Sequence, residues 1–324
     1  LAHDATLDKQ IAVKVLDSDT IDKRLNEAQI GNKLTHDNLV KMHYADVVTH
    51  EKSNLVIIAM DYHSKGSIMS EQNSGNFIPL SRGLRITTDI LRGLEYLHNS
   101  DMFHNDIKPG NILIGDYNQG VLTDYGITSH SPSGAPITAK NAYKIHKAPE
   151  VIDSFEISVL TDIYQTGLTL FRLLNGTGRI AETFHKLGET DFYSLVKDGK
   201  LISNKDYELF IPNKVRNIVN KATNTDTTKR YQSALEMRRD IERLNYPGFW
   251  TTNPSGELVG VSGKYEYLFS EVAKPKGFLD FQAFKKNTAN SRKTKIGKYS
   301  KNNLSAKETE VLKKQFLQHV VTGL

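Results

Sequence analysis

The feature that most constrains the fold of this chain is the run His-Asn-Asp-Ile-Lys-Pro-Gly-Asn at positions 104–111. It holds a carboxylate at Asp106 and an amide at Asn111, and a second carboxylate, Asp124, follows thirteen residues after the amide. Short apolar segments on both sides of the turn-rich stretch 115–120 predict a β-hairpin. A hairpin returns the chain on itself, so we expect Asp124 to lie beside Asn111.

This run resembles the catalytic core of the Hanks-type (eukaryotic-type) serine/threonine protein kinases, a family with bacterial members. Asp-Tyr-Gly at 124–126 and Ala-Pro-Glu at 148–150 follow it in the family's order, and Lys108-Pro109 is typical of the serine/threonine branch. A solvated loop followed by an ordinary turn would explain any one tripeptide, but not three in this order. A small-molecule phosphotransferase shares the Asp106 and Asn111 spacing without the later motifs.

The resemblance implies phosphoryl transfer from ATP to a protein substrate. Asp106 would accept or orient the proton of the attacking hydroxyl, and Lys108 would lie by the γ-phosphate. Asn111 and Asp124 would supply the hard oxygen ligands that Mg²⁺ prefers. The implied cofactors are therefore ATP and Mg²⁺.

The residues that the resemblance assigns to ATP binding lie mostly upstream. Residues 10–16 have the apolar, β-branched composition of a buried strand, interrupted by Lys14. In kinases this lysine holds the α- and β-phosphates and pairs with a glutamate of the next helix, here Glu27 in a helix expected over 20–34. The alternative is a snorkelling lysine and a surface glutamate. A second strand at 55–60 leads into a hinge-like segment, and the adenine contacts would be Ala12, Met60, Asp61, His63 and Leu113.

Five further residues have structural roles in the resemblance: His104, Tyr125, Glu150, Asp162 and Arg230. Helical spacing of apolar residues predicts an amphipathic helix over 81–99, before the catalytic run. The apolar segment 159–174 contains Asp162, and a buried carboxylate there needs partners. The resemblance implies that the Asp162 carboxylate bonds the backbone of the catalytic loop and that Arg230 pairs with Glu150.

The implied fold class is α+β, a two-lobed protein-kinase-like fold with a C-terminal extension. We expect a small β-rich N-lobe at 1–62, a larger helical C-lobe at 63–244 and the extension at 245–324. The family's glycine-rich loop and first strand do not precede Lys14, because Leu1 to Asp4 resembles the strand after that loop. We favour a missing segment over nucleotide binding without the loop.

Three positions depart from the family pattern. Asn105 replaces the arginine that receives a phosphorylated activation loop, so loop phosphorylation need not be an obligatory switch. Gly31 stands where a bulky apolar residue normally packs on the aromatic residue that is Tyr125 here. Tyr143 occupies the usual position of a threonine beside the substrate. Because the missing glycine-rich loop, Asn105 and Gly31 depart from the family pattern, a catalytically weak pseudokinase, acting as a nucleotide-binding scaffold or regulatory interaction module, is the main alternative.

Composition bounds the remaining options. The chain has 324 residues, 38% of them hydrophobic and 24% charged, as in soluble globular proteins. It has no apolar run near the roughly twenty residues needed to cross a bilayer, so we expect no transmembrane segment. The absence of cysteine excludes disulfides and thiolate chemistry. The simplest expectation is a cytoplasmic location.

Positive charge is concentrated in the extension. From residue 245 onward the net charge is +7, against −2 for residues 1–244. The stretch 285–301 is rich in lysine and free of acidic residues, which favours a solvated flexible linker over a site for nucleic acid, an acidic partner or an anionic membrane. After it, Ser305 and Glu308 read as a capping box that opens a final helix. The apolar side of that helix would be Val311, Leu312, Phe316, Leu317 and Val320.

Overall fold

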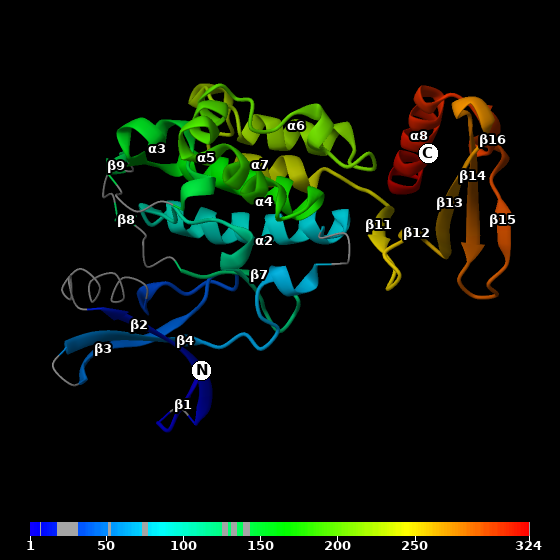
Figure 1. Ribbon diagram of the computed structural model, residues 1–324. Coiled ribbons are helices and arrows are strands. Elements are labelled where there is room, and N and C mark those ends of the chain that lie inside the picture. Colours follow the sequence, from blue (N-terminus) through cyan, green and yellow to red (C-terminus); the bar gives the residue numbers. More distant parts are fainter. Residues whose placement is uncertain are drawn as a thin grey trace.

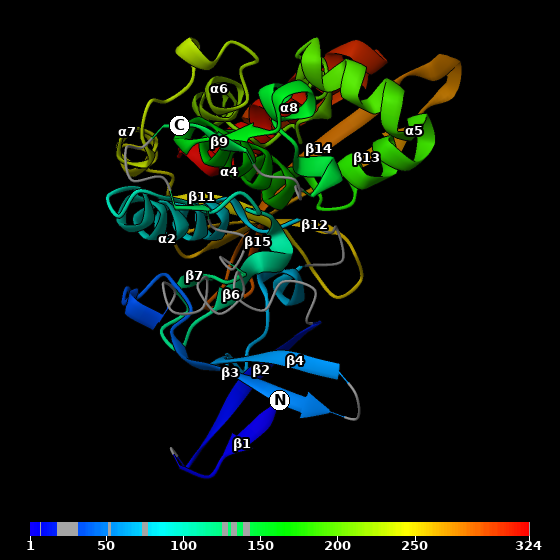
Figure 2. The same ribbon diagram turned by 90° about the vertical axis from the view of Figure 1, so that its left-hand side faces the viewer.

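The computed structural model describes residues 1–6, 8–17, 32–50, 53–72, 77–124, 129–130, 135–138 and 143–323. Figure 1 shows three parts in chain order: a blue sheet, a helical body coloured from cyan to yellow-green, and an orange sheet beside a red helix. In Figure 2, turned by 90°, the first sheet again lies below the helical body.

The first sheet is antiparallel and has four strands in the order β1-β2-β4-β3. Its strands are β1 (Ala2–Asp4), β2 (Lys9–Asp17), β3 (Met42–His50) and β4 (Ser53–Asp61). β2 and β4 contain the two apolar runs read from the sequence, and Val56 and Ile58 of β4 are buried in a core shared with the helical body. The expected α+β fold with a small β-rich lobe is confirmed.

The helical body is built around α4 (Val159–Asn175), whose side chains are buried from Thr161 onward. Beside it lies α2 (Leu80–His98), which buries an apolar stripe as its spacing predicted. The other helices are α3 (Pro149–Ser154), α5 (Arg179–Lys197), α6 (Asn213–Ala222) and α7 (Ala234–Glu242). Short strands connect them: β5 (Met102–Phe103), β6 (Ile112–Ile114), β7 (Gly120–Leu122), β8 (Ser129–His130), β9 (Ile137–Thr138) and β10 (Glu156–Ile157).

The extension forms a second, six-stranded sheet covered by one helix. Strands β11 to β15 follow one another in order, and β16 pairs with β14 alongside β15. The elements are β11 (Gly248–Thr252), β12 (Leu258–Ser262), β13 (Tyr265–Ala273), β14 (Leu279–Asn287), β15 (Lys293–Lys295), β16 (Lys301–Leu304) and α8 (Ala306–Thr322). The flexible linker expected at 285–301 is therefore wrong, because most of that stretch pairs with or borders β14.

The predicted terminal helix is confirmed, and its apolar side packs on this sheet. Ser305 and Glu308 form the expected capping box. Phe316 and Trp250 are fully buried with ring centroids 5.8 Å apart, and the Trp250 indole N–H donates to the carbonyl of Leu317 at 2.8 Å. Val311 is 51% exposed, so it does not belong to the buried side that we expected.

The extension contacts the helical body, where β11 lies against α2 and the Gln318 side chain donates to the carbonyl of Leu209 at 3.3 Å. No helix in the described part of the chain is both long enough and apolar enough to cross a bilayer.

Candidate active site

A buried carboxylate holds the start of the run 104–111. Asp162, in the first turn of α4, accepts the backbone N–H of His104 at 2.8 Å and that of Asn105 at 2.7 Å. The ring of His98 lies 2.9 Å from the same carboxylate, whose side chain has no exposed surface. These donors satisfy a charge that burial would otherwise disfavour, so the helical core fixes the path of the catalytic loop.

His104 ties this loop to the residues before Asp124. Its Nε2 lies 3.1 Å from the carbonyl of Thr123, and its Nδ1 accepts the backbone N–H of Asp106 at 3.3 Å. Because a carbonyl accepts, the proton belongs on Nε2. Complete burial lowers the pKa of His104, which agrees with this neutral tautomer.

Lys108 and Asn111 both contact the carboxylate of Asp106. The Lys108 ammonium lies 2.7 and 3.0 Å from the two carboxylate oxygens of Asp106. The Asn111 amide donates to Asp106 Oδ2 at 2.8 Å and to its backbone carbonyl at 2.9 Å. A 3₁₀ turn at Pro109–Asn111 brings the chain back far enough for these contacts. Asp106 is thus oriented by an ammonium and an amide.

The predicted hairpin is confirmed as β6 and β7, and it brings the second carboxylate back to the loop. The backbone N–H of Thr123 donates to the carbonyl of Asn111 at 3.0 Å, so Asp124 follows directly on a residue bonded to Asn111. Asp124 Oδ1 lies 2.6 Å from the ammonium of Lys14 on β2. The site therefore joins the first sheet to the helical body.

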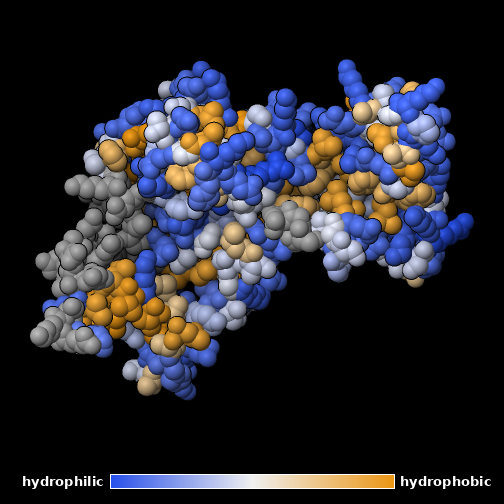
Figure 3. Space-filling view, viewed as in Figure 1, coloured by the Kyte–Doolittle hydropathy of each residue, from blue (hydrophilic) through white to orange (hydrophobic). Residues whose placement is uncertain are grey.

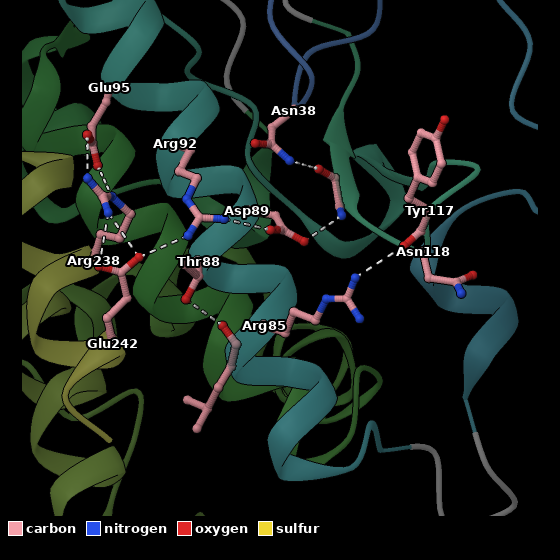
Figure 4. Close-up of polar contacts among 12 residues, drawn as sticks. Asn38, Arg85, Thr88, Asp89, Arg92, Glu95, Tyr117, Asn118, Arg238 and Glu242 are labelled. Carbon is pink, nitrogen blue, oxygen red and sulfur yellow. Dashed lines mark hydrogen bonds and ion pairs between the residues drawn. The ribbon is translucent and has the colours of Figure 1, made fainter. Parts of the chain in front are cut away.

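A polar chain across α2 positions this hairpin (Figure 4). Asp89 accepts the backbone N–H of Gly120 at 3.0 Å, and the Asn38 amide donates to the Gly120 carbonyl at 2.8 Å. Burial raises the pKa of Asp89, against the opposing effect of the Gly120 N–H. Arg92 then connects Asp89 to Glu242 on α7. Asp89 and Arg92, three residues apart on one side of α2, thereby link β7 to α7.

The hinge-like segment lies where β4 ends. Ala12 and Met60 are partners in the β2–β4 register, and Leu113 bridges to Ser67 just beyond His63. The Asp61 carboxylate binds Lys9 at 3.1 Å and His43 at 2.8 Å. Burial tends to raise the pKa of Asp61, but these two bonds outweigh it and lower that pKa. Burial also lowers the pKa of His63.

Arg230 and Glu150 form a bidentate ion pair at 2.7 and 2.8 Å. The Arg230 side chain is completely buried and donates further to the carbonyls of Asn224 and Leu160. This pair fastens the start of α3 to the segment before α7. Glu27, Gly31 and Tyr125 lie outside the described residues.

The side chain of Asn105 is buried, whereas its backbone N–H is bonded to Asp162. Its φ of 59° is left-handed, a conformation that asparagine adopts more readily than most other residues, and Asp124 has a similar φ of 63°. The side chain has no exposed surface, and neither amide atom has a hydrogen-bond partner among the described residues. Asn105 therefore offers no contact to an incoming phosphate in this conformation.

Sequence reasoning missed a second layer around Lys108. The Lys108 ammonium lies 4.3 Å from the centroid of the Tyr143 ring, and the Tyr143 hydroxyl bonds the buried guanidinium of Arg172. His146 connects Arg172, at 2.6 Å, to the carbonyl of Ile107, at 2.8 Å. Burial, then the Arg172 charge, lowers the pKa of His146 well below its usual value. Tyr143 was recognisable as an unusual residue, whereas the sequence indicated no role for His146 or Arg172.

The donor set fits a magnesium ion with bound phosphates. Asn111 uses its amide N–H groups on Asp106, which leaves its carbonyl oxygen for a metal, and Asp124 adds a carboxylate. No cluster of three or more His, Asp or Glu side chains forms a metal site in the described residues. Two protein ligands are sufficient here, because Mg²⁺ keeps waters and takes phosphate oxygens.

A cavity of about 570 Å³ lies elsewhere, between the end of α5 and α6. None of its lining residues belongs to the group around Asp106. The convergence of charged and polar side chains around Asp106 locates the candidate site better than the volume of this cavity does.

Comparison with known proteins agrees with this geometry. Residues 1–239 match the protein kinase domain family. The serine/threonine-protein kinase PrkC of Bacillus subtilis is 32% identical over 268 residues, which cover 77% of this chain and 39% of that protein. A probable serine/threonine-protein kinase of Streptomyces coelicolor is 30% identical over 257 residues, 74% of this chain and 37% of its own length. PknB of Mycobacterium leprae is 24% identical over 257 residues, 76% and 40% of the respective lengths. The chain thus spans about two fifths of the length of these relatives.

Proposed function

The chain belongs to the protein kinase family, and on that premise we propose that it transfers the γ-phosphoryl group of ATP to serine or threonine hydroxyls of a protein substrate. The observation that carries this proposal is the convergence of Lys108 and Asn111 on Asp106, with Asp124 returned beside Asn111. Asp106 accepts or orients the hydroxyl proton. Lys108 neutralises charge that develops on the transferred phosphoryl group.

ATP would lie between the first sheet and β6. Lys14 would hold the α- and β-phosphates, with Glu27 as its partner, and Asn111 and Asp124 would hold Mg²⁺, which would neutralise phosphate charge. Ala12 and Leu113 enclose the adenine ring beside Met60. The Asp61 carbonyl and the backbone of His63 meet the adenine edge, because the Asp61 N–H is already bonded to the carbonyl of Lys41 at 2.9 Å.

The domain division that suits these roles is an N-lobe at 1–62, a C-lobe at 63–244 and an extension at 245–324. His104, Asp162 and the Glu150–Arg230 pair act structurally, and Tyr125 is assigned to the same group. Buried Asn105 supports activity without phosphorylation of the activation loop. A cytoplasmic location stays a prediction of the sequence.

The test compares the parent with Asp106→Asn and Lys14→Ala in an assay with radiolabelled ATP, Mg²⁺ and a peptide acceptor. Both variants should lose at least about a hundredfold in rate, since each removes a group acting on the transferred phosphoryl. Asp116→Asn, the same change in the exposed hairpin turn, is the matched control and should retain the parent rate. A signal that persists in both site variants would contradict the assigned roles. ATP binding by an inactive parent would instead support the pseudokinase.

A further inference from the structure

Two hairpin turns meet at one end of the C-terminal sheet. One, at 263–264, joins β12 to β13, and the other, at 288–292, joins β14 to β15. The backbone N–H and the hydroxyl of Thr288 both donate to the carbonyl of Lys264, at 3.1 and 3.2 Å. These bonds hold the turns side by side. The cationic residues Lys264, Lys285 and Arg292, with Tyr265 between them, are called the basic end below.

Tyr265 continues the aromatic core of the extension beyond the helix that covers it. Phe316 of α8 contacts Tyr267, and Tyr267 contacts Tyr265, each with ring centroids 6.4 Å apart. The Tyr265 ring does not contact Phe316. It therefore lies beyond the part of the aromatic core that α8 covers. The ammonium of Lys285 lies 5.0 Å and that of Lys264 5.8 Å from its centroid.

The same ring lines a concavity of about 220 Å³. Its walls also contain two cations, two amides and a hydroxyl, and no carboxylate: Lys285, Arg292, Asn287, Asn290 and Thr294. The lower end of the extension is mostly hydrophilic in Figure 3.

The charge at the basic end is not neutralised locally. The ion pairs within the extension occupy Lys274, Lys286 and Lys313. Across residues 245–323, all of which are described, Lys264, Lys285 and Arg292 have no carboxylate within ion-pair distance.

We propose that the basic end binds single-stranded nucleic acid, with a base stacked on Tyr265 and phosphates bound by Lys264, Lys285 and Arg292. A ring between cations is the arrangement that single strands use, because every base has a π-face and every nucleotide a phosphate. An anionic membrane suits the site less well, since the turn residues 288–291 are Thr, Ala, Asn and Ser and offer no large apolar side chain for insertion. An acidic peptide would use the cations and leave the ring without a function.

The test is fluorescence anisotropy of a labelled oligothymidylate of about 20 nucleotides, titrated with the full chain without ATP. Replacing Lys264, Lys285 and Arg292 together by alanine should weaken binding at least tenfold. It should also lower the slope of log affinity against log salt by about two, at roughly 0.7 per lost phosphate contact. Tyr265→Leu should weaken binding at least about fivefold with the salt slope unchanged, and Tyr265→Phe should restore it.

The matched control replaces Lys276, Lys298 and Lys307 by alanine, which removes the same charge elsewhere in the extension and should leave the affinity within about twofold. Equal losses in the two triple variants would overturn the proposal. So would an unaffected Tyr265→Leu variant, or equally tight binding to polyglutamate or to phosphatidylserine vesicles. Asp106→Asn should bind the oligonucleotide as the parent does, so this proposal and the kinase proposal fail independently.

Discussion

The contact between Lys108 and Tyr143 leads to a prediction about the rate of phosphoryl transfer. The Lys108 ammonium lies 4.3 Å from the centroid of the Tyr143 ring, within the range of a cation–π interaction. Such contacts are worth about 0.5–1 kcal/mol when exposed and about 2 kcal/mol when desolvated. The Lys108 side chain is 24% exposed, so about 1 kcal/mol is appropriate. Tyr143 thereby stabilises the orientation of Lys108 beside Asp106.

Tyr143→Leu removes the ring but keeps apolar bulk. If the substitution destabilises the productive orientation of Lys108 by this amount, about 1 kcal/mol, kcat should decrease about fivefold, since about 1.4 kcal/mol corresponds to a factor of ten. The KM for ATP should change less than twofold, because the residues proposed to bind ATP do not include Tyr143. Initial rates over a range of ATP concentrations, with the peptide acceptor held at saturation, measure both quantities.

Tyr143→Phe is the matched control, because it keeps the ring face and loses only the hydroxyl that bonds Arg172. Its kcat should stay within about twofold of the parent. A double-mutant cycle with Lys108→Ala should give a coupling energy of about 1 kcal/mol. Equal rates for the Phe and Leu variants, or additivity in the cycle, would refute the reasoning.

Two further predictions concern stability. His146 is held neutral in the folded chain and binds a proton below pH about 6.5 when unfolded, so the free energy of unfolding should fall as the pH falls. In urea titrations between pH 7.5 and 5.5, His146→Gln should flatten this decline by up to about 1.4 kcal/mol per pH unit; an unchanged slope would mean that His146 titrates normally. Glu150→Ala leaves the buried Arg230 charge uncompensated and should cost about 3 kcal/mol of unfolding free energy. Adding Arg230→Met should recover part of that loss, and a further decrease would contradict this explanation.

Local patterns were sufficient for the elements that surround the site. Apolar spacing predicted α2, and the two short apolar runs predicted the β6–β7 hairpin, because each signal lies within the element that it describes. The Glu150–Arg230 pair joins residues 80 positions apart and could be expected only through the family resemblance. His146 and Arg172 were missed, because their partners become neighbours only when the helices assemble.

The sheet of the extension was missed although its signal is present. In β14, Leu279, Phe281 and Ala283 alternate with polar residues, and in β13 aromatic residues recur at every second position, 265, 267 and 269. The high lysine content at 285–301 is typical of disordered segments. The alternation of apolar residues at every second position predicts strands instead. Phe281 and Ala283 are fully buried under α8, so the alternation, not the charge, decided the structure.

The Lys14–Asp124 pair differs from the buried contacts that hold the site. Each of its side chains is 37% exposed, so the bond of 2.6 Å should contribute no more than about 1 kcal/mol to stability. A pair this weak can exchange partners when phosphates approach Lys14 and Mg²⁺ approaches Asp124. Lys14→Met should therefore change the free energy of unfolding by less than about 1 kcal/mol, and ATP binding measured by calorimetry should be lost. A loss of several kcal/mol in stability would mean that the pair holds the two lobes together, and its exchange for ATP would then be too costly.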